Sequence, residues 1–211
     1  MTVAEYQPDL QKIRAAYLSA DDLPVAASIL YNAYFDDPLF VDIFQGEKEG
    51  YEARLRSAIK EEINTYYDAK QPLIGLFEDD RLLAVTCLTS PDTAFGAGQF
   101  WHWRLKMLLT AGYFGTKQMI AKEEMVREKI PAQNYHMLSL IGVHPYYQDI
   151  GLGHVLMNAI LGLMVEDELS QGVAVLVTLP KCMSYFLDAE FESVEEIEVG
   201  HIKGLVMFRP K

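Results

Sequence analysis

The most constraining feature of this chain is one run in its second half, where an apolar strand, a turn, a glycine-bearing loop and a helix follow one another directly. The residues from His136 to Val143 are nearly all apolar, as expected for a strand buried on both faces of a sheet. Pro145 ends this strand, and the following loop carries Gly151 and Gly153. Apolar side chains then recur at helical spacing at Leu152, Val155, Leu156, Ala159, Ile160, Leu163 and Met164. The run predicts a strand-loop-helix unit.

A loop of small residues between a strand and a helix is suited to hold an anion. Small residues let the backbone approach a phosphate, free amide hydrogens converge on it, and the helix dipole adds a favourable potential. We therefore expect a phosphorylated ligand. The dinucleotide fingerprint needs a third glycine where this chain has Leu156, and a P-loop needs Gly-Lys-Ser/Thr, which the loop lacks. Both of these nucleotide-binding classes are excluded.

The run resembles the acetyl-CoA signature of the GNAT superfamily of N-acetyltransferases, which is Gln/Arg-x-x-Gly-x-Gly/Ala after a strand that ends in Val-x-Pro. Val143-His144-Pro145, Gln148, Gly151 and Gly153 all fall in register with it. Three further segments are similar to parts of the family: Ile13-Arg14-Ala15 with Asp22-Leu23-Pro24, Tyr34-Phe35-Asp36-Asp37-Pro38, and Met207-Phe208-Arg209-Pro210. The resemblance covers essentially the whole chain, with residues 91–134 matched only as a variable insertion.

The resemblance implies an α/β (mixed α+β) fold in a single N-acetyltransferase domain over residues 1–211, with a helical insertion at about 91–134. In the family, a bent and mostly antiparallel sheet is flanked by helices, and its fourth and fifth strands are parallel and splay apart. In this sequence those strands are about Met137 to Val143 and Val173 to Leu179.

The resemblance also implies acetyl-CoA as the co-substrate. The backbone around Ile141, Gly142 and Val143 would bind the pantetheine arm and polarise the thioester carbonyl, an oxyanion-type role. The loop and the first helical turn would hold the pyrophosphate; these residues are Gln148, Asp149, Ile150, Gly151, Leu152, Gly153 and His154.

Two departures from the family pattern qualify this comparison. The family often has a glycine and a basic residue where this chain has Asp149 and Ile150, so the affinity for CoA is expected to be modest. The family's Tyr-Glu-Lys-x-Gly-Phe element, whose tyrosine often protonates the departing thiolate, has Phe186 at the tyrosine position. Tyr185 lies one residue earlier, about 100° around a helix, and is the candidate general acid; the alternative is a core or surface tyrosine.

Amine acetylation also needs a neutral nucleophile, so a base or a water chain has to take a proton. His136 is the candidate base on the central strand, although a packed histidine is the alternative. Ser139 lies on the opposite face of that strand by two-residue alternation, and only one of those faces can look into the cleft. The 5 histidines are scattered, with no cluster at ligand spacing, so no metal is expected.

The remaining pattern predicts strands over Ile13 to Leu18, Leu73 to Glu78 and Arg81 to Thr89, with a tight turn at Asp79-Asp80, and one or two closing strands from Val194 to Phe208 around Gly200 to Gly204. Helices are expected from Leu23 to Tyr34, about Tyr51 to Tyr67, and Lys181 to Ala189, and Gly172 is expected to stop the glycine-loop helix. Residues 91–134 are expected to form two helices, the second at about Lys117 to Lys129, that cover a sheet face or wall the substrate pocket.

Charge and composition limit the partners. The formal net charge of −12 repels polyanions, so neither nucleic acid nor an anionic membrane surface is an expected partner. Only 2 cysteines are present, and neither a signal peptide nor a stretch long enough to span a bilayer is recognised, so a cytoplasmic location is expected. The sequence leaves the oligomeric state open, a homodimer included.

We therefore predict an acetyl-CoA-dependent N-acetyltransferase, an acyltransferase enzyme whose acceptor is a primary amine of a small molecule or a peptide. Phe186 and Ile150 keep a second hypothesis open, a catalytically degenerate member that binds CoA or an acyl-CoA as a sensor or interaction module. A third is a plain interaction protein built on the same fold. The identity of the acceptor and the acyl-chain preference are not determined by the sequence.

Overall fold

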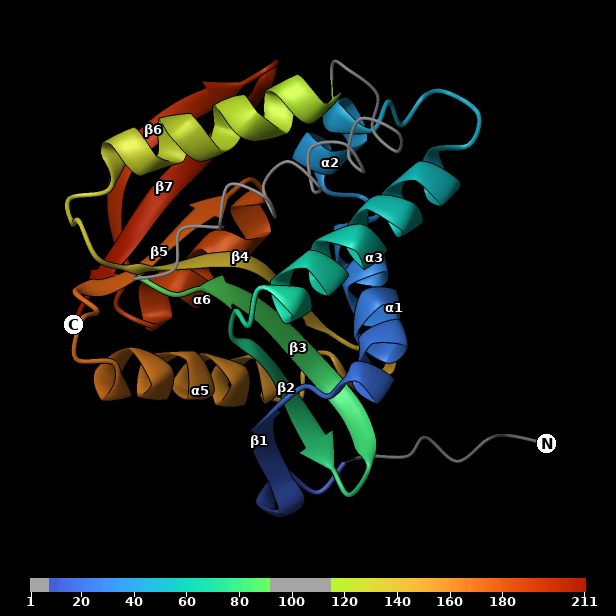
Figure 1. The fold of residues 1–211 in the computed structure, drawn as a ribbon, viewed down its shortest axis with the longest axis vertical. Coiled ribbons are helices and arrows are strands. Elements are labelled where there is room, and N and C mark those ends of the chain that lie inside the picture. Colours follow the sequence, from blue (N-terminus) through green and yellow to red (C-terminus); the bar gives the residue numbers. More distant parts are fainter. Residues whose placement is uncertain (1–7, 92–114) are drawn as a thin grey trace.

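The strands of the protein join into one mixed sheet. A computed structural model describes residues 8–91 and 115–211. Its strands are β1 (Ile13–Tyr17), β2 (Leu73–Glu78), β3 (Arg81–Thr89), β4 (His136–Val143), β5 (Gly172–Val177), β6 (Glu192–Val199) and β7 (Ile202–Pro210). They pair in the order β1-β2-β3-β4-β5-β7-β6 (Figure 1). Neighbouring strands are antiparallel except for β4 and β5, which are parallel. This confirms the mostly antiparallel sheet with one parallel pair.

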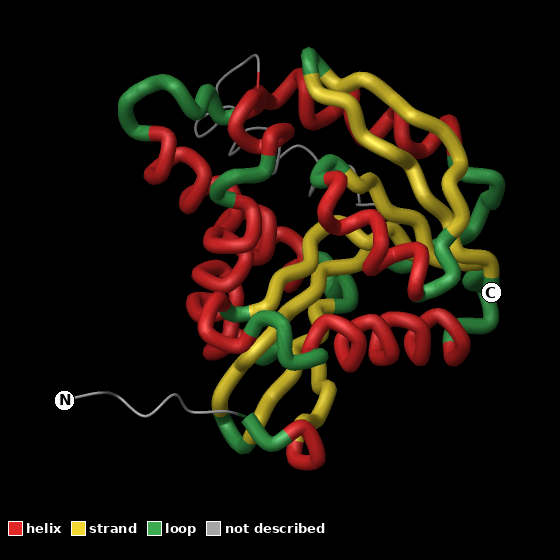
Figure 2. Tube along the Cα trace, turned by 180° about the vertical axis from the view of Figure 1, so that it is seen from behind, coloured by secondary structure: helices red, strands yellow, loops and turns green. Residues whose placement is uncertain are grey.

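Helices cover both faces of this sheet. They are α1 (Leu23–Tyr34), α2 (Pro38–Ile43), α3 (Tyr51–Asp68), a helix over residues 115–129, α5 (Leu152–Glu166) and α6 (Met183–Asp188). The first four share one hydrophobic core, whereas α5 and α6 pack on the other face. Figure 2 shows the curved sheet between these helices from behind. Among the described residues, no helix combines the length and the apolar character needed to cross a bilayer.

The helices pack through the apolar stripes seen in the sequence. On the α1 and α3 face, Leu30 and Leu55 are fully enclosed, and on the other face Leu156 and Ile160 of α5 are equally buried. Burying a side chain of this size stabilises the fold by about 1.5–3 kcal/mol. These stripes fix which side of each helix meets the sheet, and with it the position of every loop at the strand ends.

Two tight turns follow the expectations from sequence. Asp79, at the β2–β3 turn, has a φ of 52°, so an aspartate takes the left-handed conformation that glycine often supplies. Arg14 supports this turn by donating from Nη2 to the Asp79 carbonyl oxygen at 3.1 Å. The closing segment forms two strands, and Gly200, with a φ of 64°, makes the turn between them.

The expectation that Gly172 stops the glycine-loop helix was wrong. Helix α5 ends at Glu166, and Asp167 is its C-terminal cap. The Asp167 side chain then accepts from the Leu169 amide at 2.9 Å, a local turn that ends the helix earlier. Gly172 is instead the first residue of β5, where a Cβ atom would lie 2.4 Å from the Arg209 carbonyl oxygen.

The described part of the predicted insertion is helical. The helix over residues 115–129 lies beside the β6–β7 hairpin in Figure 1, and Lys129 pairs with Glu195 of β6 at 2.7 Å. At its other end, Gln118 donates to the Asp42 carboxylate of α2 at 3.0 Å. The first of the two helices expected in the insertion, and both tryptophans, lie outside the described residues.

Candidate functional site

The parallel strands β4 and β5 separate part-way along their length. Their pairing covers only three positions, from His136 with Val173 to Leu138 with Val175. Beyond this point β5 stays paired with β7, and β4 stays paired with β3. The second half of β4 therefore has an edge that no described strand covers, and this opening is where the candidate site begins.

An extra residue in β4 marks the point of separation. Cys87 of β3 pairs with Leu140, whereas the adjacent Leu88 pairs with Leu138, so Ser139 has no partner of its own in the β3–β4 ladder. Such a bulge bends a strand and shifts the alternation of its side chains by one. As a result Ser139 and Leu140 both face the α1 and α3 side, where both line the main cavity.

The bulge also sets which backbone groups of β4 face the opening. In an antiparallel ladder, the N–H and C=O of alternate residues point to the same side. The Ile141 amide donates to the hydroxyl of Tyr34 at 3.1 Å, and the Val143 carbonyl accepts from Gln148 Nε2 at 3.3 Å. Both groups thus point away from β3 and towards the opening. The intervening Gly142 is buried against α1, where a Cβ atom would lie 3.0 Å from that of Ala33.

The loop after β4 presents the start of α5 at one end of this opening. Gly151 precedes the helix with a φ of 94°, and Asp149 has a φ of 60°. The amides of His154 and Val155 bond to the Gly151 carbonyl, so those of Leu152 and Gly153 precede the first intrahelical bonds and are available to an anion. Gln148, Asp149 and Gly151 are exposed, and Ile150 is half-buried against the core beneath the loop.

Tyr185 lies against this loop. Its hydroxyl donates to the carbonyl oxygen of Gly153 at 2.7 Å, and its ring contacts the ring of His154 edge-on, 5.9 Å between centroids. A Cβ atom at Gly153 would come within 3.2 Å of the Tyr185 ring, so the glycine makes this contact possible. Burial raises the pKa of Tyr185. The neighbouring Phe186 is enclosed in the core.

An aspartate ties the first helices to the far end of β5. Asp37 caps α2 by accepting from the amides of Leu39 and Phe40, at 2.9 and 3.2 Å. Its other oxygen accepts from the Thr178 hydroxyl at 2.6 Å, just beyond the end of β5. Since Asp37 is only 3% exposed, this contact fixes the position of α1 and α2 over the opening.

His136 lies away from the cavity. It is 1% exposed on the opposite face of the sheet, with its Nδ1 3.0 Å from the Ser170 hydroxyl oxygen and its Nε2 3.3 Å from an Asp167 oxygen. These contacts connect the start of β4 to the segment after α5, and they do not bring His136 to the other candidate residues. Ser139 is on the cavity side, as the alternation in β4 predicts, and its hydroxyl oxygen accepts from Tyr66 at 2.6 Å.

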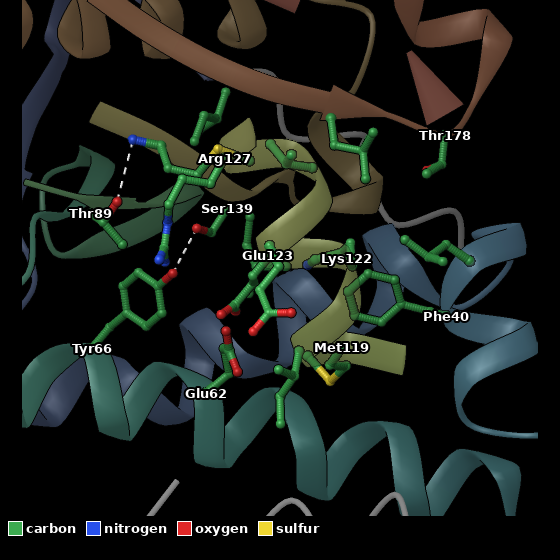
Figure 3. Close-up of a pocket in the computed structure, with 18 of the residues that line it drawn as sticks. Phe40, Glu62, Tyr66, Thr89, Met119, Lys122, Glu123, Arg127, Ser139 and Thr178 are labelled. Carbon is green, nitrogen blue, oxygen red and sulfur yellow. Dashed lines mark hydrogen bonds between the residues drawn. The ribbon is translucent and has the colours of Figure 1, made fainter. Parts of the chain in front are cut away.

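A cavity of about 710 Å³ opens beside the second half of β4. Its walls come from α1 to α3, the helix over residues 115–129, β4 and the end of β5, and Figure 3 shows several of these side chains. Aromatic and apolar groups line one part, among them Tyr34, Phe40, Phe44, Met119 and Leu176. A cavity of this size is typical of small-molecule sites. The helix over residues 115–129 therefore lines this cavity, and its role as a wall of a substrate pocket stays a prediction.

Two carboxylates enter the cavity from facing helices. In Figure 3, Glu62 of α3 and Glu123 of the helix over residues 115–129 point towards one another. Glu62 is 9% exposed. Burial raises the pKa of Glu123, and the positive charges of Lys122 and Arg127 offset this only in part. Lys122, Glu124 and Arg127 also line the cavity, so it carries charged groups of both signs.

The sequence did not show that several of these residues would meet. Tyr34, Glu62 and Glu123 each belong to a correctly predicted helix, but nothing in their spacing shows that the three helices meet at one cavity. In the described ranges, no three His, Cys, Asp or Glu side chains lie close enough to hold an ion.

Comparison with known proteins finds similarity in structure alone. No family model matches the sequence, and no curated protein matches it. Among solved structures, a histone acetyltransferase HPA2 and related acetyltransferase from Corynebacterium glutamicum is 14% identical, with a TM-score of 0.71 over 94% of this chain and 96% of that one. An arylalkylamine N-acetyltransferase like 5b from mosquito is 12% identical, with a TM-score of 0.63 over 94% and 100%.

An agmatine N-acetyltransferase is similar at 14% identity, with a TM-score of 0.56 over 95% of this chain and 100% of that one. At such identities these likenesses establish the fold. The chain therefore has the GNAT fold that the glycine-loop run predicted.

Proposed function

We propose that this chain, with its GNAT fold, is an N-acetyltransferase that transfers the acetyl group of acetyl-CoA to a primary amine of a small molecule. One observation carries the proposal. The opening between β4 and β5 has a helix N-terminus suited to phosphate at one end, and it meets an acid-bearing cavity at the other. A thioester lying along the opening would therefore present its acetyl group to an amine held in the cavity.

The groups proposed to hold acetyl-CoA are mostly backbone groups. The amides at the start of α5 would bind the pyrophosphate. The Ile141 carbonyl and the Val143 amide, the outward-facing groups that Tyr34 and Gln148 do not engage, would pair with the pantetheine amides. Residues 148–153 contain Asp149 and no basic side chain, so binding depends on amides and the helix dipole. A modest affinity is therefore expected.

The cavity supports a small amine with an apolar body as the acceptor. Glu62 and Glu123 would attract the ammonium form, and the aromatic wall near Phe40 would contact the rest of the molecule. The arylalkylamine and agmatine enzymes of similar fold act, by name, on small amines, which agrees with this choice.

The bound amine has to lose a proton before or during its attack on the thioester. A carboxylate is a better base when its pKa is raised towards neutral, and burial raises that of Glu123. Glu123 is therefore the proposed proton acceptor, with Glu62 holding positive charge beside it. His136, the base candidate from sequence, has no comparable access to the cavity.

The test combines a binding measurement with an activity measurement. We expect calorimetry to show acetyl-CoA binding, and thiol release to appear with phenylethylamine or agmatine and to be much weaker with alanine, whose carboxylate the acids repel. Glu62→Gln should raise KM for the amine, and Glu123→Gln, which removes the proposed proton acceptor, should also lower kcat. Glu128→Gln is the matched control, because Glu128 is exposed on the same helix and outside the cavity. A protein that binds no acetyl-CoA would refute the proposal.

A second candidate function is a CoA-binding module without turnover. The observation that favours it is the Tyr185 hydroxyl, which already donates to Gly153, beside a phenylalanine at the family's tyrosine position. CoA-dependent thermal stabilisation with no thiol release across the amine panel would support this alternative.

A further inference from the structure

The hydroxyl of Tyr34 lies where β4 turns its backbone towards the opening. It accepts a hydrogen bond from the Ile141 amide at 3.1 Å, across 107 positions of sequence. Tyr34 also lines the cavity. The hydroxyl therefore stands at the junction between the opening and the acid-bearing cavity, and it occupies an amide that would otherwise be free to polarise a carbonyl.

Close packing fixes this hydroxyl in place. Helix α1 approaches β4 at Gly142, where the absence of a side chain leaves room for Ala33. The Tyr34 ring packs on the ring of Phe40, with 4.7 Å between centroids. Asp37, three residues after Tyr34, ties the same segment to Thr178 at 2.6 Å. Tyr34 is thus held from the strand side, from α2 and from the end of β5.

The protonation state of Tyr34 makes it a donor. Burial raises the pKa of its hydroxyl, and the nearby charge of Asp37 raises it further, so the group keeps its proton at neutral pH. Its oxygen already accepts from Ile141, and in the described part of the chain its hydrogen is donated to no other residue. An amide that donates to a hydroxyl polarises it and strengthens the hydrogen bond that the hydroxyl can itself donate.

Tyr185, which lies against the cofactor loop, does not have this freedom. The hydrogen of Tyr185 is donated to the Gly153 carbonyl at 2.7 Å, and Phe186 has no hydroxyl. We propose that Tyr34, polarised by the Ile141 amide, donates a hydrogen bond to the thioester oxygen of the bound acetyl donor. This catalytic role for Tyr34 rests on the proposed function.

The reaction can be written with all atoms accounted for. The amine nitrogen forms a bond to the carbonyl carbon, and the π electron pair moves to the oxygen, where the Tyr34 hydroxyl stabilises the negative charge. The C=O bond then re-forms as the C–S bond breaks, and its electron pair leaves with sulfur as the CoA thiolate. The proton of the attacking nitrogen passes to a cavity carboxylate. Tyr34 keeps its own proton throughout.

The experiment compares wild type with Tyr34→Phe. Isotope-edited infrared spectroscopy of bound [1-¹³C]acetyl-CoA should show a carbonyl band that is shifted to lower frequency in wild type and that moves back towards the free value in the variant. The acetyl-CoA dissociation constant should change by less than about threefold, while kcat with the best amine falls by about 10²–10³-fold, as for loss of one oxyanion donor.

Tyr51→Phe is the matched control. This variant also removes a hydroxyl that donates a hydrogen bond, in this case to the Phe35 carbonyl at 2.7 Å, but Tyr51 lies outside the cavity. With Tyr51→Phe, the carbonyl band of bound acetyl-CoA and the kcat should match those of wild type. If Tyr34→Phe folds poorly, 3-fluorotyrosine at position 34 keeps the ring and makes the hydroxyl a stronger donor, and the carbonyl band should then move to still lower frequency.

The outcomes separate this inference from the proposed function. If acetyl-CoA binds and an amine is acetylated, but Tyr34→Phe leaves the carbonyl band and kcat unchanged, Tyr34 only occupies the Ile141 amide and the inference is overturned. A faster variant would overturn it equally, because the freed amide would then be the better donor. If wild type binds no acetyl-CoA, the proposed function itself fails.

Discussion

Replacing Gly142 with alanine tests the close approach of α1 to β4. The added Cβ would lie 3.0 Å from the Cβ of Ala33 and 3.2 Å from a methyl carbon of Leu30. Carbon atoms pack best at about 3.5–4.0 Å, so α1 has to retreat by about 0.5–1 Å. Overpacking of this kind costs about 1–3 kcal/mol, and the alanine returns about 0.5–1 kcal/mol through the unfolded state. We therefore expect a net loss of about 1–2 kcal/mol.

A double-mutant cycle with Ala33→Gly isolates the steric cause. Ala33→Gly alone should cost about 1 kcal/mol, the usual penalty for glycine inside a helix. If the two Cβ atoms are in conflict, the double variant should be about as stable as Ala33→Gly alone, giving a coupling energy of about 1–2 kcal/mol. The measurement is urea unfolding at constant m-value. If the stability losses of the two single variants sum to that of the double variant within about 0.5 kcal/mol, the packing argument is refuted.

The same cycle has a functional readout. A retreat of 0.5–1 Å would lengthen the Tyr34 to Ile141 bond from 3.1 Å to beyond hydrogen-bond distance. Gly142→Ala should therefore lower the rate of acetyl transfer as well as the stability, and Ala33→Gly in the same chain should restore part of both. If Gly142→Ala is less stable but transfers acetyl groups at the wild-type rate, the position of α1 does not affect the reaction.

Three further predictions concern the loop, the cavity and Tyr185. Asp149→Asn keeps a residue that tolerates the left-handed backbone and removes a negative charge near the proposed pyrophosphate site. Calorimetry at low salt should therefore show CoA binding about two- to fivefold tighter, and this gain should shrink at high salt. Equal affinities of wild type and variant would contradict the prediction. Because the folded-state pKa of Glu123 is raised, its ionisation opposes folding. The free energy of unfolding of Glu123→Gln should therefore match that of wild type near pH 4 and exceed it as the pH rises through the folded-state pKa. A difference in the free energy of unfolding that does not change with pH would disprove this prediction. Tyr185→Phe removes the hydrogen bond to Gly153, so its free energy of unfolding should fall by about 1 kcal/mol and its CoA binding should weaken. At saturating substrates its kcat should stay within about threefold of wild type. A hundredfold fall in kcat would instead make Tyr185 the general acid.

Local patterns predicted most of the regular elements. The bounds of β2, β3 and β4 match the sequence interpretation, because alternating or continuous apolar runs end there at turn-forming residues. The stop expected at Gly172 failed for a local reason as well. A glycine after a polar stretch resembles a helix terminus, but the Asp167 side chain had already turned the chain.

Features that depend on tertiary packing could not be predicted in the same way. The bulge at Ser139 involves no glycine or proline, and it is visible only in the pairing of β4 with β3. The bond from Ile141 to Tyr34 joins positions that are 107 residues apart. Glu62 and Glu123 belong to helices whose charged sides could equally have faced solvent. The cofactor loop has a contiguous signature, whereas the cavity is assembled from separate segments.

The separation of β4 from β5 also creates a sheet edge inside the molecule. An uncovered strand edge is a template on which another chain can add a strand and begin to aggregate. Here side chains cap that edge: Tyr34 engages the amide of Ile141, and Gln148 engages the carbonyl of Val143. We therefore expect the contacts that shape the candidate site also to keep this edge from pairing with a strand of another chain.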